Sequence, residues 1–314
     1  MSEYRILRTF GRYLRDRFGE NVAKISLSAP NFTCPNIDGA LARGGCAYCS
    51  NETFSPHLAA AFGDQKEAIL RQYRESETAF KRRGYKNGKN RVKTAQKSAK
   101  KFIAYFQSYS NTYAEVSRVA ALHEAVLAKK NCVGISIGTR ADCIDAAMLD
   151  YLRDLNRRTH LWLEIGVQSA HDQTLRAINR QETFGAVAEK IAALRSRGVL
   201  VCAHLIFGLP NETREMILES VRRVAALGVN AVKIHPLHIN KGTALARQNP
   251  PALTPAEYAD LLIAAIRILP PEMIYQRISA GIDNSTLIAP DWCRVKNSQM
   301  AYLRRALLAQ KIIY

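Results

Sequence analysis

Six short apolar segments alternate with longer amphipathic segments along the first 238 residues of the chain. The apolar segments favour β-strands at Val22–Ser28, Phe102–Ser108, Val133–Thr139, Leu161–Gln168, Leu200–Gly208 and Ala231–His235. The segments between them favour helices at Gln65–Arg82, Tyr113–Lys130, Ala141–Arg157, Phe184–Arg197 and Thr213–Leu227. This repeated order predicts a parallel sheet covered by helices, either a partial or full barrel or a doubly wound sheet.

The strand–helix order stops after His238. A helix at Thr254–Leu269 is bracketed by two proline pairs, and a short strand near Ile274–Ser279 and a basic helix at Ser298–Gln310 follow it. We therefore expect a C-terminal α/β extension over residues 241–314, after a strand–helix domain over residues 21–240. A basic helix is expected within residues 1–20, because arginines recur there every two to four positions.

The chain is strongly basic. It has 45 Lys and Arg against 27 Asp and Glu, a net charge of +18. Such a chain attracts polyanions, and nucleic acid is the leading candidate, although a solvated basic surface without a partner is the simpler alternative. The densest cluster lies within residues 81–101 and includes the candidate phosphate contacts Lys81, Arg82, Arg83, Lys86, Lys89, Arg91, Lys93 and Lys97. A second basic stretch contains Arg5, Arg8, Arg12, Arg15 and Arg17.

The apolar content of the chain excludes some protein classes. No uncharged apolar run approaches the ~20 residues that cross a bilayer. The first residues lack the apolar stretch of a signal peptide, and seven cysteines are an odd number. We therefore expect a cytoplasmic protein without membrane contact and without a disulfide framework.

Three cysteines follow the first expected strand in a glycine-rich segment. Cys34, Cys46 and Cys49 are spaced as C-x11-C-x2-C. Three thiolates can hold a [4Fe-4S] cluster and leave one iron open, whereas a structural zinc site normally has four protein ligands. Zinc with His57 as the fourth ligand, or three ordinary buried cysteines, are the alternatives.

With this cysteine motif, the chain resembles the radical SAM superfamily, and more narrowly the bacterial YhcC/YtqA-like family, a relative of the Elongator catalytic subunit. The resemblance is carried by segments 32–36, 44–49, 105–113, 138–142, 164–169, 204–210 and 233–238. It implies a partial (β/α)6 barrel over residues 21–240, with a basic insertion at 81–101. It also implies that the three cysteines hold a [4Fe-4S] cluster, with Tyr48 at the usual aromatic position. S-adenosylmethionine on the open iron would be cleaved reductively to a 5′-deoxyadenosyl radical.

The ends of the later strands carry the remaining site candidates. The candidates for binding the cofactor are Gln107, Ser108, Asn111, Arg140, Gln168 and Ser169. The alternative for the residues at 107–111 is capping of the next helix, and the alternative for Arg140 is an ordinary place on the surface. Catalytic candidates are Glu164, His204, His235 and His238. Glu164 lies inside an apolar strand, where a carboxylate is costly to bury without a partner, so a role in the site is favoured. For His204 the alternative is a hydrogen-bonded histidine of the core, which is common. Metal binding by the two last histidines is less favoured than proton transfer or substrate binding. The scattered Cys132, Cys143, Cys202 and Cys293 are expected to be structural.

The resemblance and the charge together predict a radical SAM enzyme that modifies tRNA. Relatives with an assigned role shorten the carboxymethylaminomethyl side chain of the wobble uridine to aminomethyl. An electron donor such as flavodoxin or ferredoxin is implied. The alternatives are a radical SAM enzyme for a small molecule or a protein, and a non-catalytic zinc-containing RNA-binding protein.

Overall fold

An eight-stranded parallel sheet forms the centre of the molecule. The computed structural model describes residues 4–50, 64–86, 100–279 and 285–314. The strand order is β2-β10-β8-β7-β6-β5-β4-β3. The strands are β2 Arg8–Thr9, β3 Val22–Leu27, β4 Lys101–Phe106, β5 Cys132–Thr139, β6 His160–Gln168, β7 Leu200–Phe207, β8 Ala231–Pro236 and β10 Ile274–Arg277. The six expected strands are confirmed as β3 to β8, in sequence order along the sheet, and β10 and β2 extend it.

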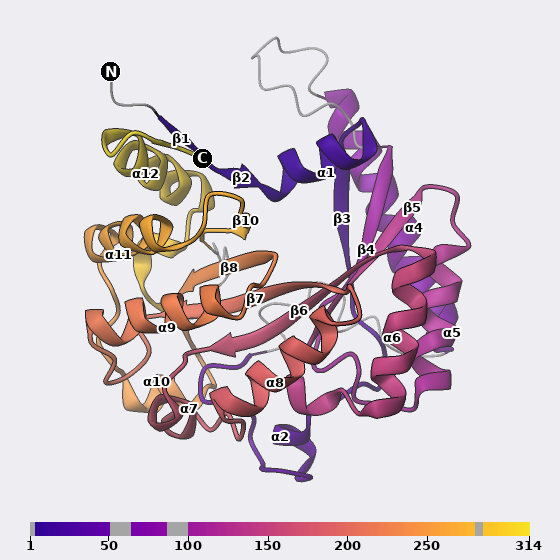
Figure 1. Cartoon of the computed structure of the whole chain (residues 1–314), viewed down its shortest axis with the longest axis horizontal. Helices are drawn as coiled ribbons and strands as arrows, with labels where there is room; N and C mark the ends of the chain where they lie inside the picture. The colour runs from indigo at the N-terminus through magenta and orange to yellow at the C-terminus, as the bar shows by residue number, and fades with distance from the viewer. Residues whose placement is uncertain (1–3, 51–63, 87–99, 280–284) are drawn as a thin grey trace.

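Helices cover the outside of the curled sheet (Figure 1). They are α4 Gln65–Lys86, α5 Val116–Leu127, α6 Ala146–Arg158, α7 Asp172–Ala177, α8 Phe184–Arg195, α9 Arg214–Ala226, α11 Pro255–Ile268 and α12 Lys296–Ala309. This arrangement is the predicted partial barrel of strands and helices. Two expected helices begin later than predicted, because a 3-10 turn occupies Ala141–Cys143 and Asp145 caps α6, while Glu115 is the N-cap residue of α5.

The N-terminal residues do not form one helix. Strands β1 (Arg5–Ile6) and β2 precede α1 (Phe10–Phe18), so the prediction that Arg5 and Arg8 share a helical face with the later arginines is wrong. Strand β1 pairs with β12 (Ile312–Ile313), and β2 pairs with β10. Long-range pairing with the C-terminal segments decides the conformation here, which a local periodicity cannot reveal.

Helix α1 fills the gap between the two edges of the sheet. It lies between β2 and β3 (Figure 1) and packs on β10 and β3. Its Phe10 meets Trp162 of β6 edge to face at a centroid distance of 5.5 Å. Phe10 and Leu14 join Ile103, Cys202 and other residues from the first halves of the strands in one apolar cluster. The amino-terminal mouth of the barrel is therefore sealed by apolar packing, and the chemistry is left to the opposite end.

The C-terminal segment completes the same body. The short strands β9 (Ile239–Asn240) and β11 (Leu287–Ala289) pair antiparallel, with α10 (Ala244–Gln248) after β9. Helix α11 starts with a capping box of Thr254 and Glu257, as its sequence suggests. All seven cysteines are free thiols. None of the described helices is both long and apolar enough to cross a membrane.

Candidate active site

The loop after β3 brings three thiols to the carboxyl end of the sheet. Cys34 precedes the short helix α2 (Pro35–Asp38), with Pro35 at its first position. Gly44 and Gly45 follow with φ of 82° and 76°, a left-handed conformation that glycine adopts without strain. These turns return the chain to Cys46, whose carbonyl accepts a 2.9 Å hydrogen bond from the amide of Cys49.

The segment after α7 holds this loop in place through hydrogen bonds. The Asn36 side chain donates to the carbonyl oxygen of Asn179 at 2.6 Å and reaches Cys46 Sγ at 3.5 Å. In return, the Asn179 side chain donates to the carbonyl oxygen of Gly45 at 2.8 Å. The amide of Ala47 donates to the carbonyl oxygen of Ile178 at 2.9 Å. The cysteine loop is thus fixed at several points to the segment that follows α7.

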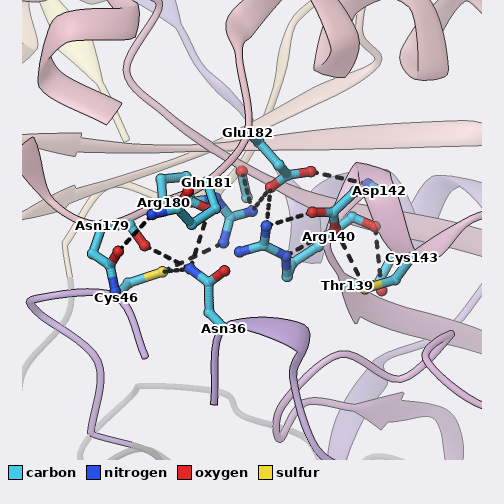
Figure 2. A network of polar contacts seen from close by, with 11 residues as sticks. Asn36, Cys46, Thr139, Arg140, Asp142, Cys143, Asn179, Arg180, Gln181 and Glu182 are labelled. Carbon is cyan, nitrogen blue, oxygen red and sulfur yellow. Dashed lines mark hydrogen bonds and ion pairs between the residues drawn. The ribbon is translucent and has the colours of Figure 1, made fainter. Parts of the chain in front are cut away.

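An ionic network that is buried except at Asp142 continues from Cys46 toward β5 (Figure 2). Arg180 lies 3.9 Å from Cys46 Sγ, donates to the carbonyl oxygen of Gly166 at 2.8 Å and pairs with Glu182 at 2.7 Å. Glu182 also faces Arg140 at 3.5 Å, and Arg140 pairs with Asp142 at 2.5 Å. Two guanidinium groups are therefore matched by two carboxylates, which is the condition for burying charge at tolerable cost. We call these four residues, Arg140, Asp142, Arg180 and Glu182, the cysteine-side network.

The cysteines open onto a cavity of about 270 Å³ at the carboxyl ends of the strands. Predicted site residues that line it are Cys34, Cys46, Tyr48, Cys49, Gln107, Arg140, Glu164, Gln168, His204, His235 and His238. The strands of a parallel barrel carry these residues to one mouth because their carboxyl ends all point the same way.

A second ionic network lies deeper, in the middle of the barrel. Glu164 of β6 is completely buried and contacts the ammonium groups of both Lys24 and Lys233. Its carboxylate also accepts from Ser136 and lies 3.1 Å from His204 Nε2. We call Lys24, Glu164 and Lys233 the barrel network. The predicted buried carboxylate is therefore real, and its partners are two lysines from β3 and β8.

Burial and charge shape the protonation of the barrel network. Burial opposes the charged form of Glu164, but Lys233 and Lys24 outweigh it and hold the pKa of this carboxyl well below its usual range. Burial lowers the pKa of Lys233 to about 8, against the pull of Glu164. Burial, reinforced by Lys233, lowers the pKa of His204 to about 4. Burial, with Arg277 as the next cause, lowers the pKa of His235 well below its usual range. Both histidines are neutral at pH 7.

Three predicted cofactor residues lie outside the set that lines the cavity. Ser108 Oγ is 2.6 Å from Ser28 Oγ. The side chain of Asn111 donates to the carbonyl oxygen of Gly138 at 2.9 Å. Ser169 Oγ contacts the carboxylate of Glu212 and accepts from the amide of His171 at 3.1 Å. These contacts hold the loops that follow β4 and β6, so the three residues are placed to position the site.

The predicted nucleic-acid residues are only partly described. Lys81, Arg82, Arg83 and Lys86 belong to α4, which continues through Gly84 beyond the expected end at Arg82; only its backbone is described there. Lys89, Arg91, Lys93, Lys97 and the alternative zinc ligand His57 lie outside the described residues.

Sequence reasoning missed several charged residues of the site, among them Lys24, Lys233, Arg180 and Glu182. Lys24 and Lys233 each interrupt an apolar strand, the same pattern that identified Glu164, so this pattern could have found them. Arg180 and Glu182 lie in a short polar loop without such a pattern, and only the fold places them behind Cys46.

Comparisons with known proteins agree with this architecture. The model of the radical SAM superfamily matches residues 42–224, and the Radical_SAM C-terminal domain matches residues 229–308. Protein YhcC of Escherichia coli K12 is 37% identical over 312 residues, which cover 98% of this chain and 94% of that protein. YtqA of Bacillus subtilis, described as uncharacterized, is 38% identical over 288 residues, 90% of this chain and 84% of that protein.

More distant similarity leads to Elongator proteins. Elongator complex protein 3 of Schizosaccharomyces pombe is 28% identical over 208 residues, 58% of this chain and 36% of that protein. The archaeal Elp3 of Methanocaldococcus infernus has the same fold, with a TM-score of 0.63 at 16% identity. The match covers 92% of this chain and 63% of the archaeal chain.

The chain belongs to the radical SAM superfamily. It is a radical SAM enzyme and uses a [4Fe-4S] cluster and S-adenosylmethionine. Within the superfamily, its similarity to YhcC and YtqA extends over nearly its whole length.

The cysteine loop fits such a cluster. Burial, followed by the neighbouring Cys46 and Cys34, raises the pKa of the Cys49 thiol to about 12. The Cys49 thiol therefore ionises readily only beside a positive partner, which the iron ions of a cluster provide.

Proposed function

We propose that this enzyme modifies tRNA by tailoring the side chain of the wobble uridine, shortening carboxymethylaminomethyl to aminomethyl. The observation that carries the proposal is a radical SAM cavity in a chain with a net charge of +18. An RNA backbone is the polyanion that such a charge attracts. The similarity to Elongator complex protein 3 supports the same substrate class. The target base would leave its stack to reach the cavity.

We infer that Cys34, Cys46 and Cys49 hold the cluster. When bound, the cluster and S-adenosylmethionine supply one-electron chemistry for hydrogen abstraction from the substrate. The protein keeps this chemistry away from water, because α1 and its apolar cluster seal the other end of the barrel. An electron donor of the flavodoxin or ferredoxin type would deliver the electron.

Four lining residues are proposed to hold S-adenosylmethionine: Tyr48, Gln107, Arg140 and Gln168. Arg140 is the clearest of them, since its Nη1 is buried without a partner among the described residues. A substrate or cofactor carboxylate would satisfy that nitrogen. Glu164, His204, His235 and His238 face the same space and are proposed to contact the substrate.

The first experiment tests the radical chemistry and the substrate together. Anaerobically reconstituted enzyme receives S-adenosylmethionine and dithionite, and 5′-deoxyadenosine is measured with and without tRNA. We expect deoxyadenosine that tRNA stimulates, and aminomethyluridine in the digested tRNA. The Cys46→Ala variant is expected to make no deoxyadenosine. Formation of deoxyadenosine that tRNA never stimulates, with unchanged nucleosides, would argue for a small-molecule or protein substrate.

A second experiment tests the basic residues. Lys89, Arg91, Lys93 and Lys97 are changed together to glutamine, and tRNA binding is measured from 50 to 300 mM salt. If these side chains contact phosphates, each lost contact reduces the slope of log K against log salt by roughly 0.7 to 0.9. The surface change Arg222→Gln on α9, far along the chain from this stretch, is the control. An unchanged affinity and slope in the four-residue variant would remove this segment from the RNA site.

A further inference from the structure

The β8–β10 wall of the cavity carries more positive charge than the acids around it can balance. Lys233 of β8 and Arg277 of β10 both line the cavity, and their Cα atoms are register partners on neighbouring strands. Lys24 of β3 contacts the same carboxylate as Lys233. Among the described residues, Glu164 is the one carboxylate that pairs with any of these three cations.

Glu164 has no capacity left for another cation. Its Oε1 atom is engaged by Lys24 and Ser136, and its Oε2 atom by Lys233 and His204. A carboxylate offers about four lone-pair sites, and four partners use them. The barrel network therefore offers no free carboxylate oxygen to a further positive group on this wall.

Arg277 is that further positive group. Arg277 is exposed at the mouth of the cavity that it lines, and in the part of the chain that the structure describes its guanidinium makes neither a hydrogen bond nor an ion pair. Its charge acts on Lys233 and His235, whose pKa values it lowers. The neighbours Lys233 and Arg277 are thus two like charges side by side, an arrangement that an anion bound between them would stabilise.

We propose that Lys233 and Arg277 form an anion subsite that holds a carboxylate of the substrate. This inference deepens the proposed function and rests on it, since a carboxymethylaminomethyl side chain ends in a carboxylate. The flat, forked guanidinium of Arg277 suits two parallel hydrogen bonds to a carboxylate, while Lys233 adds a point charge. The subsite would select the carboxylated uridine over its uncharged analogues and place the side chain inside the barrel.

The test is a binding experiment on the reconstituted holoenzyme with S-adenosylmethionine, without reductant. The probes are the free nucleoside 5-carboxymethylaminomethyluridine, its methyl ester and uridine 5′-monophosphate, each measured by equilibrium dialysis under nitrogen. We expect the acid to bind at least tenfold more tightly than the ester. The preference should fall below threefold in Arg277→Gln and return in part in Arg277→Lys, which restores the charge. The exposed Arg222 of α9, changed to glutamine, should keep the full preference.

Each remaining outcome decides the proposal. Equal binding of acid and ester by the unaltered enzyme overturns it. If Arg277→Gln weakens uridine 5′-monophosphate but keeps the preference for the acid, the subsite holds a nucleotide phosphate and the carboxylate assignment fails. A preference for the acid that depends on Arg277, together with tRNA that is never modified, supports the subsite while refuting tRNA as the substrate.

Discussion

The cavity is bounded by two buried ionic networks that differ in their balance of charge. The cysteine-side network has two arginines and two acids, Arg140 and Arg180 against Asp142 and Glu182. The barrel network has two lysines against Glu164, and Arg277 adds a third cation on the strand next to that of Lys233. Arg140, Arg180, Glu182, Glu164 and Lys233 are buried, whereas the side chains of Asp142 and Lys24 are 26% and 18% exposed and Arg277 is exposed.

The difference teaches how a buried charge can serve two purposes. A balanced network satisfies its own members and holds backbone segments together, as Arg180 does between Cys46 and Gly166. An unbalanced network remains attractive to a ligand of opposite sign. We therefore interpret the cysteine-side network as support for the cluster loop and the barrel network as part of the substrate site.

The largest effect is expected when the single acid of the barrel network loses its charge. Glu164→Gln leaves the buried Lys24 and Lys233 without a carboxylate, which should cost about 3–5 kcal/mol of unfolding free energy at pH 7. The folded pKa of Lys233, about 8, is below the value of 10.5 for an ordinary lysine. Between these values the unfolded chain binds the proton and the folded chain does not, so stability from this group rises with pH.

This sign gives the Glu164→Gln variant a pH signature. Raising the pH from 7 to 9 should return at least about 1 kcal/mol of its unfolding free energy. Urea unfolding of anaerobically purified protein at both pH values measures it. A variant that is equally unstable at pH 7 and pH 9 would show that stranded ammonium groups are not the cause.

Removing a cation from the cysteine-side network should lower the unfolding free energy by less than Glu164→Gln does, but still by a large amount. Arg180→Met leaves Arg140, at 3.5 Å, as the remaining cationic partner of Glu182 among the described residues, and should lower the unfolding free energy by about 3 kcal/mol. The double change Arg180→Met with Glu182→Met leaves the Arg140–Asp142 pair balanced and should be more stable than the single variant. If the double variant is the weaker of the two, charge balance does not hold this region together. Urea unfolding compares the variants, with the surface change Arg222→Gln, expected within about 0.5 kcal/mol, as the control.

Removing a cation from the barrel network should lower the unfolding free energy by less than Arg180→Met does. Lys24→Met leaves one lysine for one carboxylate, so its loss is expected at about 1 kcal/mol, mainly from its contacts with the rings of Phe10 and Tyr105. The same urea titration measures this change. A loss as large as that of Arg180→Met would mean that the two networks are equally balanced and that no cation is in surplus.

Acid should destabilise the folded chain, because burial and then Lys233 disfavour a proton on His204 in the barrel. The folded pKa of His204, about 4, is below the ordinary value of 6.5, so the unfolded chain takes up this proton first and stability falls as the pH drops through 6.5. From pH 7 to pH 5.5 this group should account for about 1.2 kcal/mol of lost stability. His204→Asn should reduce the loss by that amount. Identical pH profiles of the two proteins would place the proton elsewhere.

Much of the fold and part of the site were predictable from the sequence. The strands β3 to β8 follow from apolar segments of strand length, because a parallel sheet is buried on both faces. Cys34, Cys46 and Cys49 follow from their spacing, and Glu164 from its place inside an apolar strand. The sites of Gly198 and Gly228, which end helices in left-handed conformations, were also predictable.

Other features depend on contacts between distant parts of the chain. The N-terminal arginines show helical spacing, yet Arg5 and Arg8 lie in strands because β12 and β10 offer edges for pairing. Ser169 ends a strand as a cofactor residue would, but its hydroxyl contacts Glu212, 43 positions away.

The sequence by itself determined the strand–helix order, the cysteine motif and the excess of positive charge, since each of these is local or additive along the chain. Only the tertiary structure decided which charges meet. Lys24, Glu164 and Lys233 come from three strands that curvature of the sheet brings to one interior, and Arg277 joins them because β10 pairs with β8. Whether a buried charge is balanced depends on distances between side chains far apart in sequence, because electrostatic energy falls with separation in space and not along the chain.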